Sequence, residues 1–182
     1  MPEEREAKLP VEDLPKVRRR LQALGAHLET PPTRESNWVL DDLSGSLYHR
    51  GCLLRLRQWG KQHLLTFKGP GRMEGGVKVR KELETGVEHV EKTLPILAEL
   101  GFAVAFFYEK ERESWRVGSV TVALDHTPLG DFVELEGEAE ALGAVAAQLG
   151  LDLRRAVAAT YAELWQEHRR KHPQAPAHMV FP

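Results

Sequence analysis

The sequence has one cysteine, no long apolar run and almost no excess charge. Cys52 alone excludes an intramolecular disulfide framework, so we expect a reducing, cytoplasmic setting. No stretch approaches the ~20 apolar residues of a membrane helix, and the acidic amino terminus lacks the apolar segment of a signal peptide, so no membrane partner is expected. The net charge is −2, with 25 basic and 27 acidic residues, which disfavours nucleic acid as a partner.

What the sequence has instead is charge at two-residue spacing, mostly with apolar residues in between. The segments are Glu4-Arg5-Glu6-Ala7-Lys8, Arg55-Leu56-Arg57, Thr66-Phe67-Lys68, Lys78-Val79-Arg80-Lys81-Glu82-Leu83-Glu84, Lys110-Glu111-Arg112, Ala123-Leu124-Asp125 and Glu134-Leu135-Glu136. In a strand, residues two apart share a face. The pattern therefore predicts strands with one charged face and one apolar face.

An antiparallel sheet with one solvated face gives the same alternation, and for any single segment that is the simpler explanation. Two features of the whole set favour an enclosed charged face. It carries few Ser, Thr, Asn or Gln side chains, which solvated faces usually mix in. It also groups like charges, as at Glu4 and Glu6 or Arg55 and Arg57, and neighbouring like charges repel unless a ligand compensates them.

Apolar periodicity and turn residues predict eight strands and four helices. The strands are expected at residues 3–9, 35–41, 52–58, 62–68, 77–85, 103–115, 119–125 and 131–137. The helices are expected at 14–24, 90–100, 138–149 and 153–171, with a flexible loop at 69–76 and an irregular tail at 172–182 docked through Met179, Val180 and Phe181. Eight antiparallel strands can close into a barrel that holds one small ligand. We therefore predict an α+β fold, an eight-stranded antiparallel closed barrel with helices outside, as a single domain over 1–171.

If the charged faces point inward, eight basic side chains line one cavity: Lys8, Arg55, Arg57, Lys68, Lys78, Arg80, Lys110 and Arg112. Burying that many cations requires counter-charge, part of it from carboxylates and part from a polyanionic ligand. Guanidinium groups match phosphate oxygens in pairs, so a chain of phosphates is the expected ligand. Glu4, Glu6, Glu134, Glu136 and Asp125 form an all-oxygen set that suits Mg²⁺ or Mn²⁺.

These motifs, taken in order, resemble the CYTH proteins, also called triphosphate tunnel metalloenzymes. Glu4-Arg5-Glu6-Ala7-Lys8 is similar to their ExExK strand, and Gly51-Cys52-Leu53-Leu54-Arg55-Leu56-Arg57 to their G-x-x-LRxR strand. The later segments and Thr160-Tyr161-Ala162-Glu163-Leu164, which resembles a closing helix motif, follow in family order over residues 3–165. The aromatic pair usual in the second strand is Val39-Leu40 here.

The resemblance implies an eight-stranded tunnel that binds a triphosphate and a divalent metal. It implies metal ligation by Glu4, Glu6 and Glu136, with Glu134 and Asp125 as further candidates. It implies phosphate binding by the basic residues named above other than Lys78, which the strand pattern alone adds to the set. Glu82 and Glu84 would orient these basic side chains or help to hold a second metal. Glu4, Glu6, Lys8 and Arg57 are the expected catalytic residues.

Three functions remain open at this point. The first is a metal-dependent triphosphatase that acts on inorganic tripolyphosphate or on an organic or nucleoside triphosphate. The second is a class IV adenylyl cyclase: Lys68-Gly69-Pro70 resembles cyclase-like members, but only Met1-Pro2-Glu3 precede the ExExK strand, where those cyclases share a His-Phe pair. The third is a non-catalytic polyphosphate-binding module, in which the carboxylates have no role. We favour the triphosphatase, with a small-molecule triphosphate as partner and a monomeric or homodimeric state.

Overall fold

The computed structural model describes residues 3–182, and Met1 and Pro2 lie outside the described residues. The strands are β1 (Glu3–Val11), β2 (His27–Asp41), β3 (Leu53–Trp59), β4 (Gln62–Lys68), β5 (Arg72–Glu74), β6 (Val77–Gly86), β7 (Ala103–Val117), β8 (Val120–Thr127) and β9 (Gly130–Glu136). The helices are α1 (Leu14–Ala23), α2 (Ser46–His49), α3 (Val90–Glu99), α4 (Ala139–Gln148) and α5 (Tyr161–Lys171), with one 3-10 turn, η1 (Leu153–Arg155).

The strands form one closed antiparallel barrel. Their order is β1-β9-β8-β7-β2-β3-β4-β6, and a second pairing of β1 with β6 closes the ring. At that seam Glu4 lies opposite Arg80, and Glu6 lies opposite Lys78. This confirms the predicted eight-stranded barrel with helices outside. β5 is a short ninth strand that pairs with Val77–Val79 at the start of β6, whereas β4 pairs with the later residues of β6.

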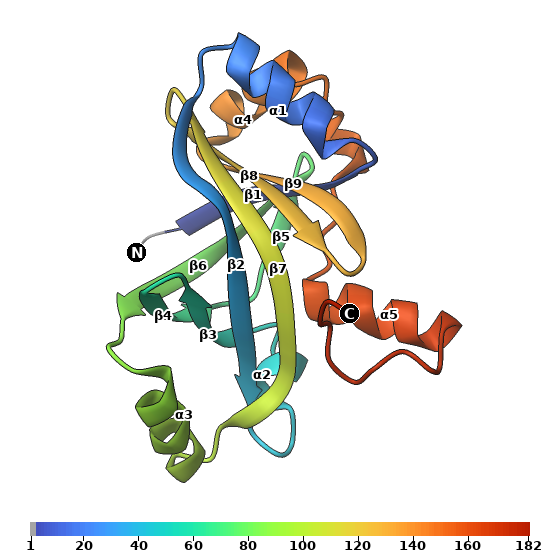
Figure 1. Cartoon of the computed structure of the whole chain (residues 1–182). Helices are drawn as coiled ribbons and strands as arrows, with labels where there is room; N and C mark the ends of the chain where they lie inside the picture. The colour runs from blue at the N-terminus through green and yellow to red at the C-terminus, as the bar shows by residue number, and fades with distance from the viewer. Residues whose placement is uncertain (1–2) are drawn as a thin grey trace.

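Helices cover the outer face of the barrel. This face is formed by the apolar residues that alternate with the charged residues along each strand. Figure 1 shows α1 and α4 together at one end, α3 at the other, and α5 beside the long strand β7. The largest apolar cluster joins Leu21 of α1 and Leu142 of α4 to Leu9, Val79 and Leu135 of the barrel wall. Because these outer side chains pack against helices, the charged side chains at the alternate positions face the barrel interior.

Three predicted segments differ from the structure. β2 begins at His27, eight residues before the predicted start at residue 35. The loop at 69–76 contains β5, which turns into β6 through Gly75 and Gly76, both at positive φ as tight hairpins require. The single helix expected over 153–171 is wrong: η1 ends at Arg155, and α5 begins only at Tyr161. A capping box between Thr160 and Glu163 fixes that later start.

The carboxyl-terminal tail docks on β7, as predicted for Met179. Met179 is fully buried and forms an isolated parallel bridge with Tyr108. Its neighbours include Trp165 of α5, whose indole nitrogen donates to the Pro176 carbonyl oxygen at 3.0 Å. The tail therefore secures α5 against the barrel.

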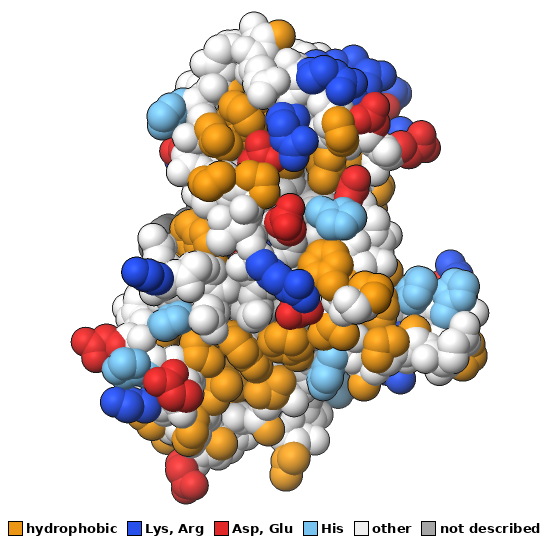
Figure 2. All heavy atoms as spheres, viewed as in Figure 1, with side chains coloured by type: hydrophobic (Ala, Val, Ile, Leu, Met, Phe, Trp, Pro, Cys, Tyr) orange, Lys and Arg blue, Asp and Glu red, His pale blue; other side chains and the backbone are white. Residues whose placement is uncertain are grey.

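Apolar side chains are also exposed around the end of the barrel that α3 covers. Figure 2 shows them gathered on the lower part of the face in view. Ile96 and Leu100, at 61% and 68% exposure, are the most exposed large apolar residues of the α3 region. None of the helices within residues 3–182 has the length and apolar character needed to cross a bilayer.

Candidate functional site: a charged tunnel

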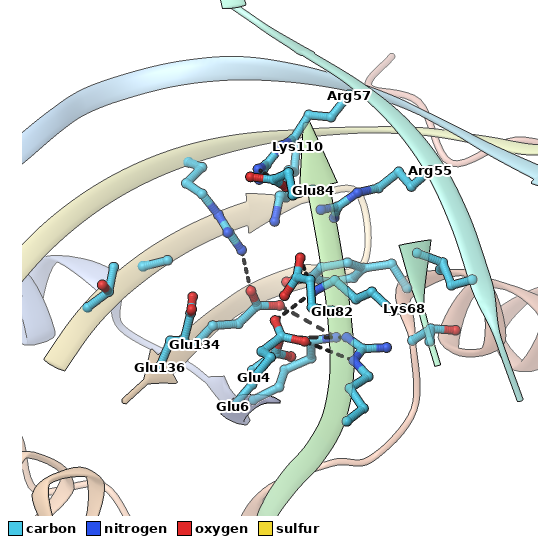
Figure 3. A pocket seen from close by; sticks show the side chains of 18 of the residues that line it. Glu4, Glu6, Arg55, Arg57, Lys68, Glu82, Glu84, Lys110, Glu134 and Glu136 are labelled. Atoms are coloured by element: carbon cyan, nitrogen blue, oxygen red, sulfur yellow. Dashed lines mark hydrogen bonds and ion pairs between the residues drawn. The ribbon is translucent and has the colours of Figure 1, made fainter. Parts of the chain in front are cut away.

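The barrel interior holds a cavity of about 300 Å³ lined largely by ionic side chains (Figure 3). Seven Lys or Arg side chains and six Glu side chains take part in the lining: Lys8, Arg55, Arg57, Lys68, Arg80, Lys110, Arg112, Glu4, Glu6, Glu82, Glu84, Glu134 and Glu136. Leu53, Tyr108, Ser114, Thr121, Ala123, Thr160 and Tyr161 complete it. The predicted inward placement of the charged faces therefore matches the observed lining at these thirteen positions.

Two carboxylates of the lining face each other, and the one ion pair that either makes among residues 3–182 is between Glu6 and Arg80 at 3.8 Å. Glu6 of β1 lies directly opposite Glu136 of β9. Burial raises the pKa of Glu6, and the nearby Glu134 carboxylate raises it further. Burial and the Glu4 carboxylate likewise raise the pKa of Glu136. Such a pair holds negative charge that favours the arrival of a cation.

Two other carboxylates are already neutralised by basic side chains. Glu4 accepts from Lys68 Nζ at 2.5 Å and from Arg80 Nε at 2.9 Å. Burial alone would raise the pKa of Glu4, but Lys68 and Arg80 outweigh it and lower that pKa. Glu134 contacts Arg112, and its other oxygen lies 3.5 Å from Lys8 Nζ. These ion pairs hold four cationic side chains in defined positions on the tunnel wall.

The opposite wall carries arginines whose donors remain available. Arg55 Nε and Arg57 Nε are buried and have no acceptor among the described residues. One Arg55 terminal nitrogen lies 3.4 Å from the Tyr108 hydroxyl. Arg57 has Glu84 at 3.5 Å and Glu35 at 3.7 Å, which are long contacts for ion pairs. Figure 3 shows both arginines across the cavity from the Glu4, Glu6, Glu134 and Glu136 group.

Asp125 and Lys78, two predicted site residues, are not among the residues that line this cavity. Asp125 is completely buried. Its carboxylate accepts from Lys110 at 2.9 Å, from Arg112 at 2.6 Å and from the Tyr161 hydroxyl at 2.8 Å. Burial is outweighed by Arg112 and Lys110, which lower the pKa of Asp125. Asp125 therefore positions Lys110 and Arg112, and its role as a metal ligand stays a prediction.

Lys78 lies at the end of the inward face of β6, where it turns away from the tunnel. Its ammonium group donates to the Ala158 carbonyl oxygen at 2.8 Å. The side chain lines a second cavity, which adjoins the tunnel.

Three residues that contact the basic side chains of the site were not among the predicted site residues. Glu35 is 1% exposed and lies within 4 Å of Arg57, Lys110 and Arg112. Tyr108 and Tyr161 line the cavity, and the ammonium groups of Lys8 and Lys110 lie 4.2 Å and 5.1 Å from the Tyr161 ring centroid. The two-residue spacing between Glu35 and Asn37 was the sequence feature that could have predicted an inward direction for Glu35. For Tyr161, the sequence offered only its place in the closing helix motif.

The donor set fits a hard divalent cation. Four glutamates supply only oxygen, which suits Mg²⁺ or Mn²⁺. Desolvation and neighbouring carboxylates raise the pKa values of Glu6 and Glu136, so a bound cation would stabilise their ionised forms. Among residues 3–182, no three His, Cys, Asp or Glu side chains are already arranged around a common metal position. Glu4 and Glu134 would therefore exchange a basic partner for the metal.

Comparison with known proteins shows the family. Residues 2–155 match the CYTH domain, so the chain belongs to the CYTH domain family. A curated protein of Methanocaldococcus jannaschii named "putative adenylate cyclase" is 28% identical over 132 residues, which cover 72% of this chain and 74% of that protein.

Solved structures share the fold at low sequence identity. A "putative adenylate cyclase" from Vibrio parahaemolyticus superposes with a TM-score of 0.80 at 22% identity, covering 90% of this chain and 97% of that one. A protein from Hippeastrum, described as a putative adenylyl cyclase with a dominant triphosphatase activity, gives a TM-score of 0.68 at 16% identity, covering 91% and 96%.

Proposed function

We propose that this chain is a divalent-metal-dependent triphosphatase that hydrolyses the terminal phosphoanhydride of a triphosphate held in the tunnel. The observation that carries the proposal is the enclosed cavity of about 300 Å³ with seven basic and six acidic side chains in its lining. Basic groups bind the phosphates, and acidic groups recruit the metal that offsets the remaining negative charge. A non-catalytic anion-binding module gives no role to Glu6 and Glu136, whose pKa values are raised by desolvation and by neighbouring carboxylates, so that keeping them ionised costs stability.

The basic side chains bind and orient the phosphate chain. Arg55 and Arg57 offer buried Nε donors from one wall, and Lys8, with Lys110 behind it, offers ammonium groups beside the Tyr161 ring. Guanidinium forks bind phosphate oxygens two at a time, whereas the lysines add point charge. In this arrangement the triphosphate lies along the tunnel between the arginine wall and the glutamate wall.

The glutamates hold the metal. Glu6, Glu136, Glu4 and Glu134 are the residues that would bind it, and Glu82 and Glu84 support Lys68 and Arg57 through contacts at 3.4 Å and 3.5 Å. When bound, a divalent metal neutralises phosphate oxygens and lowers the pKa of a coordinated water.

Hydrolysis then requires one displacement at the terminal phosphorus. Water attacks that phosphorus, the bridging P–O bond breaks, and its electron pair leaves on the diphosphate product. Lys8 and Arg57 neutralise the charge that develops on the transferred group, so positioning and electrostatics supply the rate enhancement.

The direct test is turnover of purified protein with tripolyphosphate, thiamine triphosphate and ATP, each with Mg²⁺ or Mn²⁺. Release of inorganic phosphate from any of the three supports the proposal. Cyclic AMP with pyrophosphate would establish the cyclase instead. Metal-independent binding without any product would establish the binding module.

Three variants assign the roles. Glu4→Gln and Glu6→Gln should abolish turnover by weakening metal binding. Arg57→Ala should weaken substrate binding, raising KM by roughly 10- to 100-fold, the worth of one or two charge-assisted hydrogen bonds. It should also lower kcat, because Arg57 neutralises charge that develops during the displacement. Glu138→Gln is the matched control, because Glu138 is exposed and its one ion pair within residues 3–182 is with Arg5 at 3.6 Å. Wild-type turnover by Glu4→Gln would remove that carboxylate from the mechanism.

Adenylyl cyclase is the second candidate. Its specific support is the name of the Methanocaldococcus jannaschii relative. The same tunnel serves cyclisation if the ribose 3′-hydroxyl attacks the α-phosphorus, in place of water attacking the terminal phosphorus. The product analysis described above separates the two reactions.

A further inference from the structure

Asn37 is the single asparagine of the chain, and it lies on the inward face of β2. Its neighbours Trp38 and Leu40 pack outside the barrel, in the apolar cluster that includes Val90 of α3. Because side chains alternate along a strand, Asn37 points to the interior. It is 0% exposed and is not among the residues that line the tunnel cavity, so it lies behind the side chains that do.

The polar atoms of Asn37 belong to a cluster of buried groups without partners. Within residues 3–182, the buried side-chain atoms that make no hydrogen bond are Glu35 Oε2, Asn37 Nδ2, Asn37 Oδ1, Arg55 Nε and Arg57 Nε. All of them belong to β2 or β3, and the register places Asn37 directly opposite Arg57. Buried polar atoms nearly always have partners, and each exception calls for an explanation. Their concentration behind the arginines of the tunnel wall points to a role in ligand binding.

The two arginines of this cluster are held loosely. One Arg55 terminal nitrogen lies 3.4 Å from the Tyr108 hydroxyl, and Arg57 lies 3.5 Å from Glu84 and 3.7 Å from Glu35. Burial lowers the pKa of Arg57, and the neighbouring Arg55 lowers it further. Like charges side by side repel each other. A neutral acceptor beside Arg57 would fix the direction of its guanidinium group against that repulsion.

We propose that Asn37 is a positioning residue of the phosphate site, which holds Arg57 in its ligand-binding direction. When a phosphate chain occupies the tunnel, the Asn37 carboxamide oxygen accepts from one guanidinium nitrogen of Arg57, and the other donors of the fork bind phosphate oxygens. The carboxamide is neutral, so the full charge of Arg57 stays available to the phosphate. An aspartate of the same shape would form an ion pair with Arg57 and compete with the ligand. This inference rests on the proposed function, because it places a phosphate chain in the tunnel.

Two substitutions of Asn37 separate its polarity from its lack of charge. Asn37→Leu keeps the approximate size of the side chain and removes both polar atoms. Partners that orient a binding side chain, measured best at metal sites, contribute about 10- to 100-fold. We therefore expect Asn37→Leu to lower kcat/KM for the best of the three triphosphates at least about tenfold. Asn37→Asp should raise KM by about tenfold or more, the worth of one charge-assisted hydrogen bond.

Ser36→Ala is the matched control. Ser36 is the preceding residue of β2, is half-buried and does not line the tunnel cavity. Its variant should match the wild type in kcat and KM. If Asn37→Leu fails to fold, Asn37→Ala takes its place.

A double-mutant cycle tests whether Asn37 acts through Arg57. Kinetics are measured for the wild type, Asn37→Leu, Arg57→Ala and the double variant. In the Arg57→Ala background we expect Asn37→Leu to lower kcat/KM by less than about twofold, because the side chain that Asn37 positions is gone. A purely structural asparagine would give equal losses in both backgrounds, which would overturn the inference. Wild-type kinetics of Asn37→Leu and Asn37→Asp would overturn it too, and both results leave the triphosphatase proposal standing.

If no triphosphate is hydrolysed, the proposed function is overturned and binding alone decides the inference. Because Asn37 is the single asparagine, asparagine labelled with ¹⁵N in its side-chain amide gives one pair of amide proton signals in NMR spectra. We expect saturating tripolyphosphate with Mg²⁺ to shift this pair in the wild type and not in Arg57→Ala. An unshifted pair in the saturated wild type, or an equal shift in Arg57→Ala, would refute the inference. Calorimetry that detects no tripolyphosphate binding would refute both claims.

Discussion

Replacing Asp125 with Asn tests whether one buried carboxylate holds the basic wall of the tunnel together. The substitution keeps the shape of the side chain and removes its charge. Asp125 is fully buried and accepts from Lys110 at 2.9 Å, from Arg112 at 2.6 Å and from Tyr161 at 2.8 Å. Lys110 is itself only 1% exposed, so its charge cannot turn to solvent when the carboxylate is lost.

The expected cost is large for a single substitution. Removing one partner from a buried ion pair typically costs about 3–5 kcal/mol, because an uncompensated charge stays buried. Glu35 remains 3.7 Å from the Lys110 ammonium nitrogen and compensates part of the loss. We therefore expect the free energy of unfolding to fall by about 3 kcal/mol, the lower end of that range. Urea unfolding at pH 7, followed by tryptophan fluorescence and far-UV circular dichroism, measures it.

Asp131→Asn is the matched control. Asp131 also pairs with a basic residue, His126 at 2.7 Å, but at the surface. Exposed pairs contribute at most about 1 kcal/mol. If Asp125→Asn costs no more than this control, the reasoning about the buried cations is wrong.

The pH dependence of the difference in unfolding free energy between the wild type and Asp125→Asn provides a second check. Arg112 and Lys110 outweigh burial and lower the pKa of Asp125 in the folded state below its unfolded value, which is about 3.9. The contribution of Asp125 to stability is therefore complete above that unfolded value and is lost as the pH falls towards the folded pKa. The stability gap between wild type and Asp125→Asn should narrow below about pH 4. A constant gap down to pH 3 would show that ionisation of Asp125 does not stabilise the fold.

Three further predictions concern the rest of the site and the tail. Glu136→Gln should raise the melting temperature without metal, because burial and Glu4 disfavour the Glu136 carboxylate. It should also shrink the stabilisation by Mn²⁺, and an unchanged Mn²⁺ shift would exclude Glu136 as a ligand. Tyr161→Phe should keep KM near the wild-type value, whereas Tyr161→Leu removes the ring beside Lys8 and should raise it; equal KM values would show that the ring does not position Lys8. Met179→Ala should cost about 2–5 kcal/mol in urea unfolding, as for other buried methionines, and a loss below about 1 kcal/mol would show that the tail packs loosely.

Two-residue alternation was enough to predict the inward faces of the strands. Glu4, Glu6 and Lys8 line the tunnel because β1 is regular, and strand geometry alone then fixes their direction. Alternation does not tell which inward side chains remain accessible. Asp125 shares the inward face of β8 but lies beneath Lys110 of β7 and Tyr161 of α5. Whether Asp125 is covered depends on the lengths of side chains from other elements. The sequence of a single strand does not predict this.

Breaks in the alternation explain what was missed in β2. The strand begins at His27, whereas the sequence predicted residue 35, because Pro31 and Pro32 are poor strand residues. The structure tolerates them where the pairing of β2 with β7 shifts register, between Thr30 and Thr33. The predicted strand therefore began at Glu35 itself, with no earlier inward residue to mark its face.

The seam between β1 and β6 has a consequence for how the chain folds. β1 opens the sequence, yet it pairs with β6 near the middle and with β9 much later, where Glu6 meets Glu136. Contacts between residues so far apart along a chain form slowly, because much chain freedom is lost before they are made. We therefore expect the pairing of β1 with β9, which brings Glu6 to Glu136, to form late in folding. A divalent cation present during refolding would favour that step by drawing the two acidic strands together.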